Sequence, residues 1–317
     1  MIGFLASRLG QAIMVLLAMS FVVYGLMGLM PGDPIDLMIA ADPKMTSEDA
    51  ARLRALHGLD KSILERYGHW LSAAMAGDLG FSRLYSRPVL EALAPALANT
   101  LVLLGSAFLL ALLIAFPAGI AAAARPRSPL DYLVNLFAFA GISMPVFWVG
   151  LLLILLFAVA WGWLPASAAG AGSAEGWWDW TRHLILPVAT LAIANIGGYA
   201  RYVRSSLIET LRQDYIRTAR AKGAGPLRVL LRHGLRNALI PVVTVVALDL
   251  GSLVSGALVT ETLFAHPGMG KLIFDAVMGN DFNLALVGLL IATALTLAGN
   301  LLADLAYVWL DPRIARP

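Results

Sequence analysis

Hydrophobic positions along the chain gather in six long blocks instead of alternating with polar ones. Each block is close to the ~20 residues that a helix needs to cross the ~30 Å hydrocarbon core of a bilayer. A helix also satisfies its own backbone hydrogen bonds where no water is present. The pattern therefore predicts an all-α membrane protein with six transmembrane helices. The blocks are Leu9–Met30, Ala98–Ala124, Tyr132–Trp161, Leu184–Tyr202, Leu239–Thr260 and Leu284–Leu310.

The first block could also be a signal peptide. Its apolar run is longer than the ~7–15 residues of a signal-peptide core. It is followed by Pro31-Gly32-Asp33-Pro34 instead of a small-residue cleavage site. We therefore expect a retained membrane helix.

Polar residues between the first two blocks predict two short helices on a surface cap. Thr46-Ser47-Glu48-Asp49 is typical of a capping box, and Asp60 is a candidate N-cap for a second helix. The region up to residue 97 is therefore expected to be a first domain, 1–97, made of one membrane helix and an external subdomain. Residues 98–317 would form a five-helix core.

The second block carries small residues at four-residue spacing, namely Ala111, Ala115, Gly119 and Ala123. Such a stripe allows another helix to approach closely. We expect a tightly packed partner helix on this face.

Composition agrees with a membrane protein, and the scattered candidate residues predict no enzyme site. The chain is 59% hydrophobic and 14% charged, with a mean hydropathy of +0.78. The absence of cysteine excludes disulfides and thiolate chemistry. No catalytic or metal-binding constellation is expected, because the histidines are scattered without ligand spacing. They are His57, His69, His183, His233 and His266.

Positive charge is concentrated between the fourth and fifth blocks. The loop between the third and fourth blocks offers only Arg182, and the loop between the fifth and sixth only Lys271. Because basic loops stay in the cytoplasm, segment 201–237 and both termini are expected there. Its nine cations are Arg201, Arg204, Arg212, Arg217, Arg220, Lys222, Arg228, Arg232 and Arg236.

This basic segment is also patterned for structure. Apolar residues separate the cations, and Gly223-Ala224-Gly225-Pro226 interrupts them, which predicts short surface helices. Contact with anionic lipid is one interpretation. Docking of a partner explains the length and structure of the segment better.

An acidic residue, Asp249, lies in the middle of the fifth block. Ionisable groups at that depth normally face a bundle interior or a watery cavity. Asp249 is a candidate for a translocation path that attracts cationic or amine-bearing solutes; a purely structural pairing is the alternative. Ser252, Ser255 and Asn195 are further path candidates, with packing as the alternative for Asn195.

The basic segment contains two distinctive runs, Arg217-Thr218-Ala219-Arg220-Ala221-Lys222-Gly223 and Arg232-His233-Gly234-Leu235-Arg236-Asn237-Ala238-Leu239-Ile240-Pro241. They resemble the cytoplasmic "EAA" loop of ABC importer permeases, and more narrowly its peptide/nickel branch. Arg217 and Thr218 stand where the general pattern has Glu and Ala, as is usual for that branch. Further matching runs are Pro31–Pro34, Gly77–Gly80, Ser143–Trp148, Glu261–Phe264, Pro267–Gly270 and Leu310–Arg313.

The resemblance implies a type I ABC importer permease (MetI-like) architecture in a bacterial inner membrane. It implies a second permease, two cytoplasmic ATPases and an external or periplasmic solute-binding protein as partners, within the lipid bilayer and without nucleic acid. Residues 217–223 would form the ATPase-coupling helix. ATP and magnesium would be held by the ATPases, with no cofactor bound by this chain.

Peptides are the cargo that the resemblance favours, with nickel chelates and glutathione-like peptides as alternatives. Two other functional classes are alternatives. An autonomous ion-coupled transporter would use Asp249 as its ion site, and an integral-membrane enzyme would need a catalytic constellation that the sequence lacks.

Overall fold

The structure, a computed structural model, describes residues 2–29, 52, 61–170 and 175–310. The chain divides into two compact units, which are described separately below. The first comprises Met1–Leu97 with Leu272–Ala294, and the second Ala98–Lys271 with Leu295–Pro317. The domain division at residue 97 stays a prediction.

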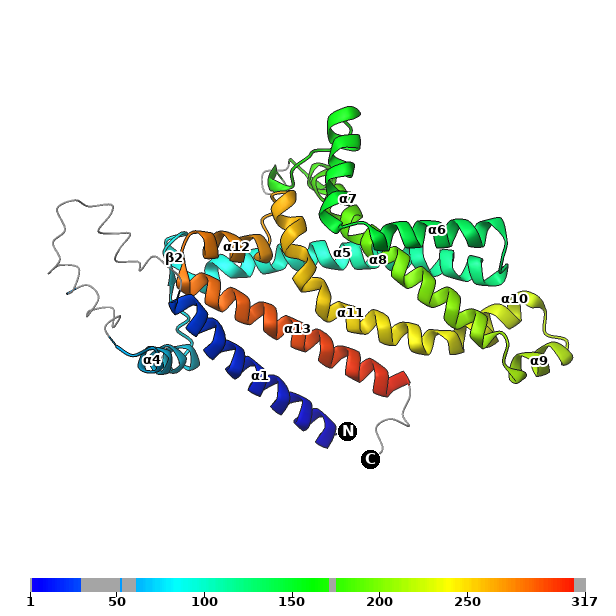
Figure 1. The fold of residues 1–317 in the computed structure, drawn as a ribbon, viewed down its shortest axis with the longest axis horizontal. Helices are drawn as coiled ribbons and strands as arrows, with labels where there is room; N and C mark the ends of the chain where they lie inside the picture. The colour runs from blue at the N-terminus through cyan, green and yellow to red at the C-terminus, as the bar shows by residue number, and fades with distance from the viewer. Residues whose placement is uncertain (1, 30–51, 53–60, 171–174, 311–317) are drawn as a thin grey trace. The chain divides into compact units, whose positions relative to one another are not determined.

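The described residues are overwhelmingly helical (Figure 1). A two-stranded antiparallel ribbon pairs β1 (Phe81–Ser82) with β2 (Arg87–Pro88). The α-helices are α1 (Ile2–Gly28), α4 (Ile63–Met75), α5 (Val89–Ala124), α6 (Pro129–Ser143), α7 (Val146–Leu153), α8 (Trp177–Thr210), α9 (Asp214–Ala221), α10 (Pro226–Arg228), α11 (Arg236–Leu263), α12 (Met269–Met278) and α13 (Phe282–Leu310). The π-helices are η1 (Ile154–Ala160) and η3 (Val229–Leu235).

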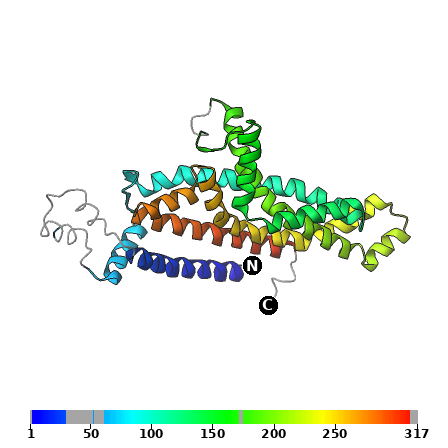
Figure 2. The same cartoon turned by 45° about the horizontal axis from the view of Figure 1, so that its top comes forward.

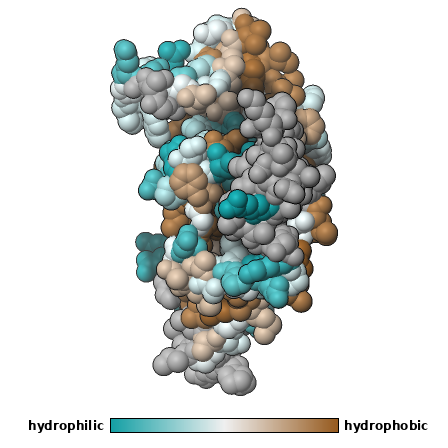
Figure 3. Space-filling view, turned by 90° about the vertical axis from the view of Figure 1, so that its left-hand side faces the viewer, coloured by the Kyte–Doolittle hydropathy of each residue, from teal (hydrophilic) through white to brown (hydrophobic). Residues whose placement is uncertain are grey.

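The predicted all-α membrane architecture is confirmed. In the described part of the chain, five helices are long and apolar enough to cross a membrane, and the count becomes six if one bent pair is a single span. Many large hydrophobic side chains on α1, α5, α6 and α7 are exposed. Figure 3 shows such hydrophobic surface beside hydrophilic patches. This is the surface expected of a protein solvated by lipid.

The third predicted block, Tyr132–Trp161, is not one straight helix. It forms α6 and then α7 with η1, which meet at 106°. Met144, between them, has an extended backbone with ψ 132°. A proline disfavours the α-helical conformation of the residue before it, and Pro145 follows Met144. The prediction of a continuous helix was therefore wrong at this position.

Helix α8 is the scaffold of the second unit, and α6, α7 and α11 all pack against it (Figures 1 and 2). The predicted small-residue stripe of α5 is confirmed as a close helix contact. Ala111 and Ala115 are fully buried in a cluster with Tyr199 and Ala200 of α8. A β-carbon added at Gly119 would lie 2.6 Å from the carbonyl oxygen of Ala200. Only glycine allows this approach of the two backbones.

In the first unit, α4 packs on α1. The Tyr67 hydroxyl of α4 hydrogen-bonds Ser20 of α1 at 2.8 Å, and its ring meets those of Phe21 and Tyr24 edge-on. The helix begins after Ser62, which forms a capping box with Glu65. The proposed N-cap Asp60 was therefore misplaced by two residues. Asp60 itself and the predicted capping box at Thr46 lie outside the described residues.

A buried acid ties the ribbon to α13 within the same unit. The carboxylate of Asp281 accepts hydrogen bonds from the Ser82 hydroxyl at 2.6 Å and the Leu84 backbone N–H at 2.9 Å. It also accepts one from the Leu284 N–H at 3.3 Å, at the start of α13. The ribbon is thus anchored at a helix N-terminus, where a negative charge is favourable.

Candidate functional sites

The first candidate site is the basic connector, which we define as residues 211–235 between α8 and α11. Within it, α9 turns one face inward. Ile216 is 0% exposed and Ala219 is also buried, three residues apart and therefore on the same side of the helix. The outward residues of α9 and its end are Tyr215, Arg217, Thr218, Arg220, Ala221 and Lys222.

Helix α9 ends in a Schellman motif centred on Gly223. The Ala224 N–H donates to the Ala219 carbonyl at 3.1 Å, and the Gly223 N–H donates to that of Arg220 at 2.9 Å. Gly223 has φ +82°, the left-handed conformation that this motif requires. Nothing lies within 4 Å of the position of a β-carbon there. Glycine is therefore needed for its backbone conformation and not for space.

The connector returns through α10 and the π-helix η3, and it is fastened to the end of α8. A β-carbon at Gly234 of η3 would lie 2.9 Å from Leu211 and 3.1 Å from Leu207. The Ser206 hydroxyl donates to the Ala238 carbonyl at 2.8 Å. The connector is thus a folded platform held on α8, as the predicted short surface helices require.

Most of the charge on this platform is exposed. Arg217 pairs with Asp214 at 3.4 Å, but the two side chains are 82% and 94% exposed, so the pair contributes little stability. Exposed hydrophobic residues lie among the cations, notably Tyr215, Leu227 and Leu231. A mixed apolar and cationic surface of this kind is suited to a protein partner with acidic groups at its rim.

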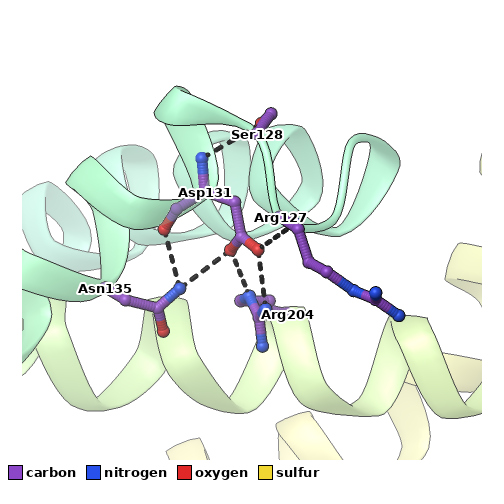
Figure 4. Close-up of polar contacts among 5 residues, drawn as sticks. All are labelled: Arg127, Ser128, Asp131, Asn135 and Arg204. Atoms are coloured by element: carbon purple, nitrogen blue, oxygen red, sulfur yellow. Dashed lines mark hydrogen bonds and ion pairs between the residues drawn. The ribbon is translucent and has the colours of Figure 1, made fainter.

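Three of the nine predicted cations lie outside the connector, namely Arg201 and Arg204 in α8 and Arg236 at the start of α11. Arg201 is exposed, with its guanidinium 5.8 Å from the ring centroid of Phe139 on α6. Arg204 is directed inward and binds Asp131 of α6 with two nitrogens (Figure 4). Arg204 therefore lies within α8, where its side chain is 25% exposed, and not in the loop after it.

The Asp131 cluster was missed by sequence reasoning. Asp131 is 2% exposed. Besides Arg204, its carboxylate accepts hydrogen bonds from Asn135 Nδ2 and from the Arg127 backbone N–H, both at 2.8 Å. Ser128, the N-cap of α6, accepts from the Asp131 N–H at 3.2 Å. The run Ser128-Pro129-Leu130-Asp131 fits the capping signature Ser-x-x-Asp, which could have located the helix start but not the arginine.

The second candidate site is the predicted translocation path. Asp249 is half-buried on α11, and it interacts electrostatically with the buried hydroxyl of Tyr199 on α8. Asn195 lies one turn before Tyr199 and donates to the Leu191 carbonyl of its own helix at 2.8 Å. The side chains of Ser252 and Ser255 lie outside the described residues. The role of all four path candidates stays a prediction.

A third cluster lies where α11 meets α12. Glu261 is 0% exposed, and its carboxylate accepts from the Thr100 hydroxyl at 2.5 Å and the Lys271 N–H at 3.0 Å. The Met269 N–H donates to the same Thr100 oxygen at 2.7 Å. A β-carbon at Gly270 would lie 2.8 Å from the α-carbon of Leu258. These contacts hold the turn between α11 and α12 in place, and we interpret the cluster as structural.

No group of three or more metal-ligating side chains is found in the described part of the chain. The expectation that this chain binds no cofactor stays a prediction.

Comparison with known proteins covers both units. Residues 115–316 match the family described as "Binding-protein-dependent transport system inner membrane component", and residues 1–101 match the N-terminal membrane component of the same systems. The chain is 39% identical to the oligopeptide transport system permease protein AppB of Bacillus subtilis over 316 residues, 99% of each chain. It is 37% and 35% identical to the dipeptide transport system permease proteins DppB of Alkalihalophilus pseudofirmus and Escherichia coli K12, again over 99% of each chain.

Proposed function

Because the chain belongs to the family of binding-protein-dependent transport system inner membrane components, we propose that it is a permease subunit of an ATP-driven importer of peptides. The observation that carries this proposal is similarity over 99% of the chain to permease proteins named for dipeptide or oligopeptide transport. Cargo of related chemistry, such as nickel chelates or glutathione-like peptides, is the nearest alternative.

The basic connector is proposed as the surface on which an ATPase subunit docks. Its support is structural: α9 rests on two buried residues, ends in a defined Schellman motif and exposes the side chains of residues 217–222. The ATPase would hold ATP and magnesium, since this chain offers no phosphate-binding loop. By the charge rule the connector and both termini lie in the cytoplasm.

The proposed assembly contains two permeases, two ATPases and an external solute-binding protein. ATP-driven closure of the ATPases would move α9, and through it α8 and α11, between inward-open and outward-open states. A ligand shifts such an equilibrium only by its differential affinity for the two states. The ATPase dimer supplies that difference by contacting the connector more extensively in one state.

The path is proposed to run beside α8 and α11, where Asn195, Tyr199 and Asp249 are found. A carboxylate there would attract the amino group of a peptide. Ser252 follows Asp249 by three residues, a spacing that makes the two neighbours on a helix, and Ser255 follows Ser252 by three more.

Reconstitution tests the proposal directly. Liposomes containing this chain, a second permease and both ATPases are expected to import labelled dipeptides when binding protein is outside and ATP inside. Liposomes with this chain alone, under a proton or sodium gradient, are expected to import none. Transport by the chain alone would instead support an autonomous ion-coupled transporter, and import of a nickel chelate but no peptide would overturn the cargo.

A further inference from the structure

The Asp131–Arg204 pair joins α6 to α8, the helix that leads into the basic connector (Figure 4). Arg204 is two residues before Ser206 and three before Leu207, which fasten η3 and α11 to α8. The same end of α8 therefore holds the connector on one side and α6 on the other.

The other described contacts between α6 and α8 include the approach of Arg201 to the Phe139 ring and close contacts of the two backbones. A β-carbon at Gly197 would lie 2.5 Å from the Ala138 carbonyl oxygen, and one at Gly141 would lie 3.1 Å from that of Ile193. Backbones in such contact are held by dispersion forces, which have no preferred direction. These contacts set how closely the two helices approach each other.

The ion pair adds a strongly directional contact between the same two helices. Arg204 binds both carboxylate oxygens of Asp131, and two-point recognition fixes angle as well as distance. Asn135 and the Arg127 N–H occupy the other acceptor sites, so the carboxylate has four donors. Because Asp131 is buried, loss of any charged partner leaves an uncompensated charge.

Helix α6 leads from this pair to the 106° elbow and α7. At its far side α7 is packed against the end of α11: a β-carbon at Gly150 would lie 2.6 Å from Leu263 and 3.3 Å from Phe264. A shift of α6 on α8 would therefore be felt at the opposite end of α11.

We infer that the Asp131–Arg204 pair is a positioning clamp, which fixes the register of α6 on α8 and passes movement of the basic connector to the elbow between α6 and α7. The claim that the pair passes on movement of the connector, which is the functional part of the inference, rests on the proposed docking role of the connector. The claim that the pair fixes the register of α6 on α8, which is the geometric part, does not depend on that role.

The geometric part is tested by spin-label distances in the full chain, which has no native cysteine. Labels at Leu136→Cys on α6 and Arg217→Cys on α9 occupy exposed positions. We expect a narrow distance distribution that broadens in Asp131→Asn and in Arg204→Gln. Arg201→Gln is the matched control, because Arg201 also contacts α6 from α8 but forms no part of the clamp. Unchanged distributions in both clamp variants would overturn the inference.

The functional part is tested in the reconstituted importer. Uptake per ATP hydrolysed is expected to fall about tenfold in each single clamp variant, an effect of the size found for changes within coupling networks. The double variant should lose no more than either single one, since the two residues act as a unit. ATPase association should be unchanged in the clamp variants. Uptake per ATP hydrolysed should be unchanged in Arg201→Gln.

The variant Asp131→Leu/Arg204→Met separates positioning from stability. Apolar replacement of a whole buried pair often preserves stability, so its melting temperature is expected to exceed those of the single variants. Uptake per ATP should nevertheless stay low. Recovery of uptake together with stability, or a parallel loss of uptake and hydrolysis in the single variants, would reduce the clamp to a structural ion pair.

The two proposals fail in different ways. Absence of ATP-driven uptake by the parental assembly would defeat the proposed function and the transmission role of the clamp. The distance distributions would still decide whether the pair fixes the register.

Discussion

At the scale of single residues, Asp249 is the side chain whose surroundings bear most directly on cargo. An acid within a membrane helix is costly unless it faces other polar groups or water. Tyr199 supplies one polar neighbour, and a peptide amino group would supply a charged one.

We therefore predict that Asp249→Asn lowers uptake of dipeptides with a free amino terminus about tenfold, since a hydrogen bond to a charged group contributes ~1.5–3 kcal/mol. Uptake of amino-acetylated dipeptides should change less. The control is Tyr199→Phe, which removes the neighbouring hydroxyl and keeps the carboxylate. Equal uptake by the parental chain and Asp249→Asn would assign the carboxylate a structural role.

The residue scale also shows where sequence reasoning reaches its limit. The cations of the connector were found because they are neighbours in sequence. Asp131 and Arg204 are 73 residues apart, and nothing in either local run specifies the partner. Arg204 looks like any other basic residue near the end of a membrane helix until the packing of α6 on α8 is known.

At the scale of elements, the sequence predicted where helices end better than where they bend. The glycine that ends α9 lies within the predicted break at residues 223–226, and the Schellman motif explains its position. The bend at Pro145 was missed because a hydropathy pattern depends only on which residues are apolar and contains no information on backbone dihedral angles. Ser62 and Glu65 form a capping box that outweighs Asp60.

Gly223 offers a prediction at this scale. Gly223→Ala forces a β-carbon into the left-handed region at a cost of roughly 1–2 kcal/mol, whereas asparagine tolerates that region. We expect Gly223→Ala to reduce both ATPase co-purification and peptide uptake, and Gly223→Asn to retain most of each. Because the site has open space, side-chain size is not the cause. Equal defects in the two variants would contradict a conformational role.

At the scale of the whole molecule, the sequence predicted the class of fold correctly, since long apolar blocks have few alternatives to membrane helices. The orientation of the chain in the bilayer remains a prediction from the positive charge of the connector. It can be tested because cysteine is absent and each introduced thiol reports alone.

We predict that a membrane-impermeant maleimide labels Trp178→Cys in intact cells and Lys222→Cys only after permeabilisation. Both positions are exposed. Labelling of detergent-solubilised protein at both sites is the control for reactivity. The reverse pattern would place the connector outside and remove it as an ATPase surface.

The bend at Pro145 bears on whether the chain crosses the membrane an even or an odd number of times. A chain that crosses a membrane an even number of times ends on the side where it began. The other candidate spans among the described residues number five, so by these alone a shared side for both termini requires the bent pair to cross once. Helix α6, with 15 residues, is about 22 Å long and falls short of the ~30 Å core on its own. The side on which the C-terminus lies is therefore decided by whether α7 and η1 complete that crossing.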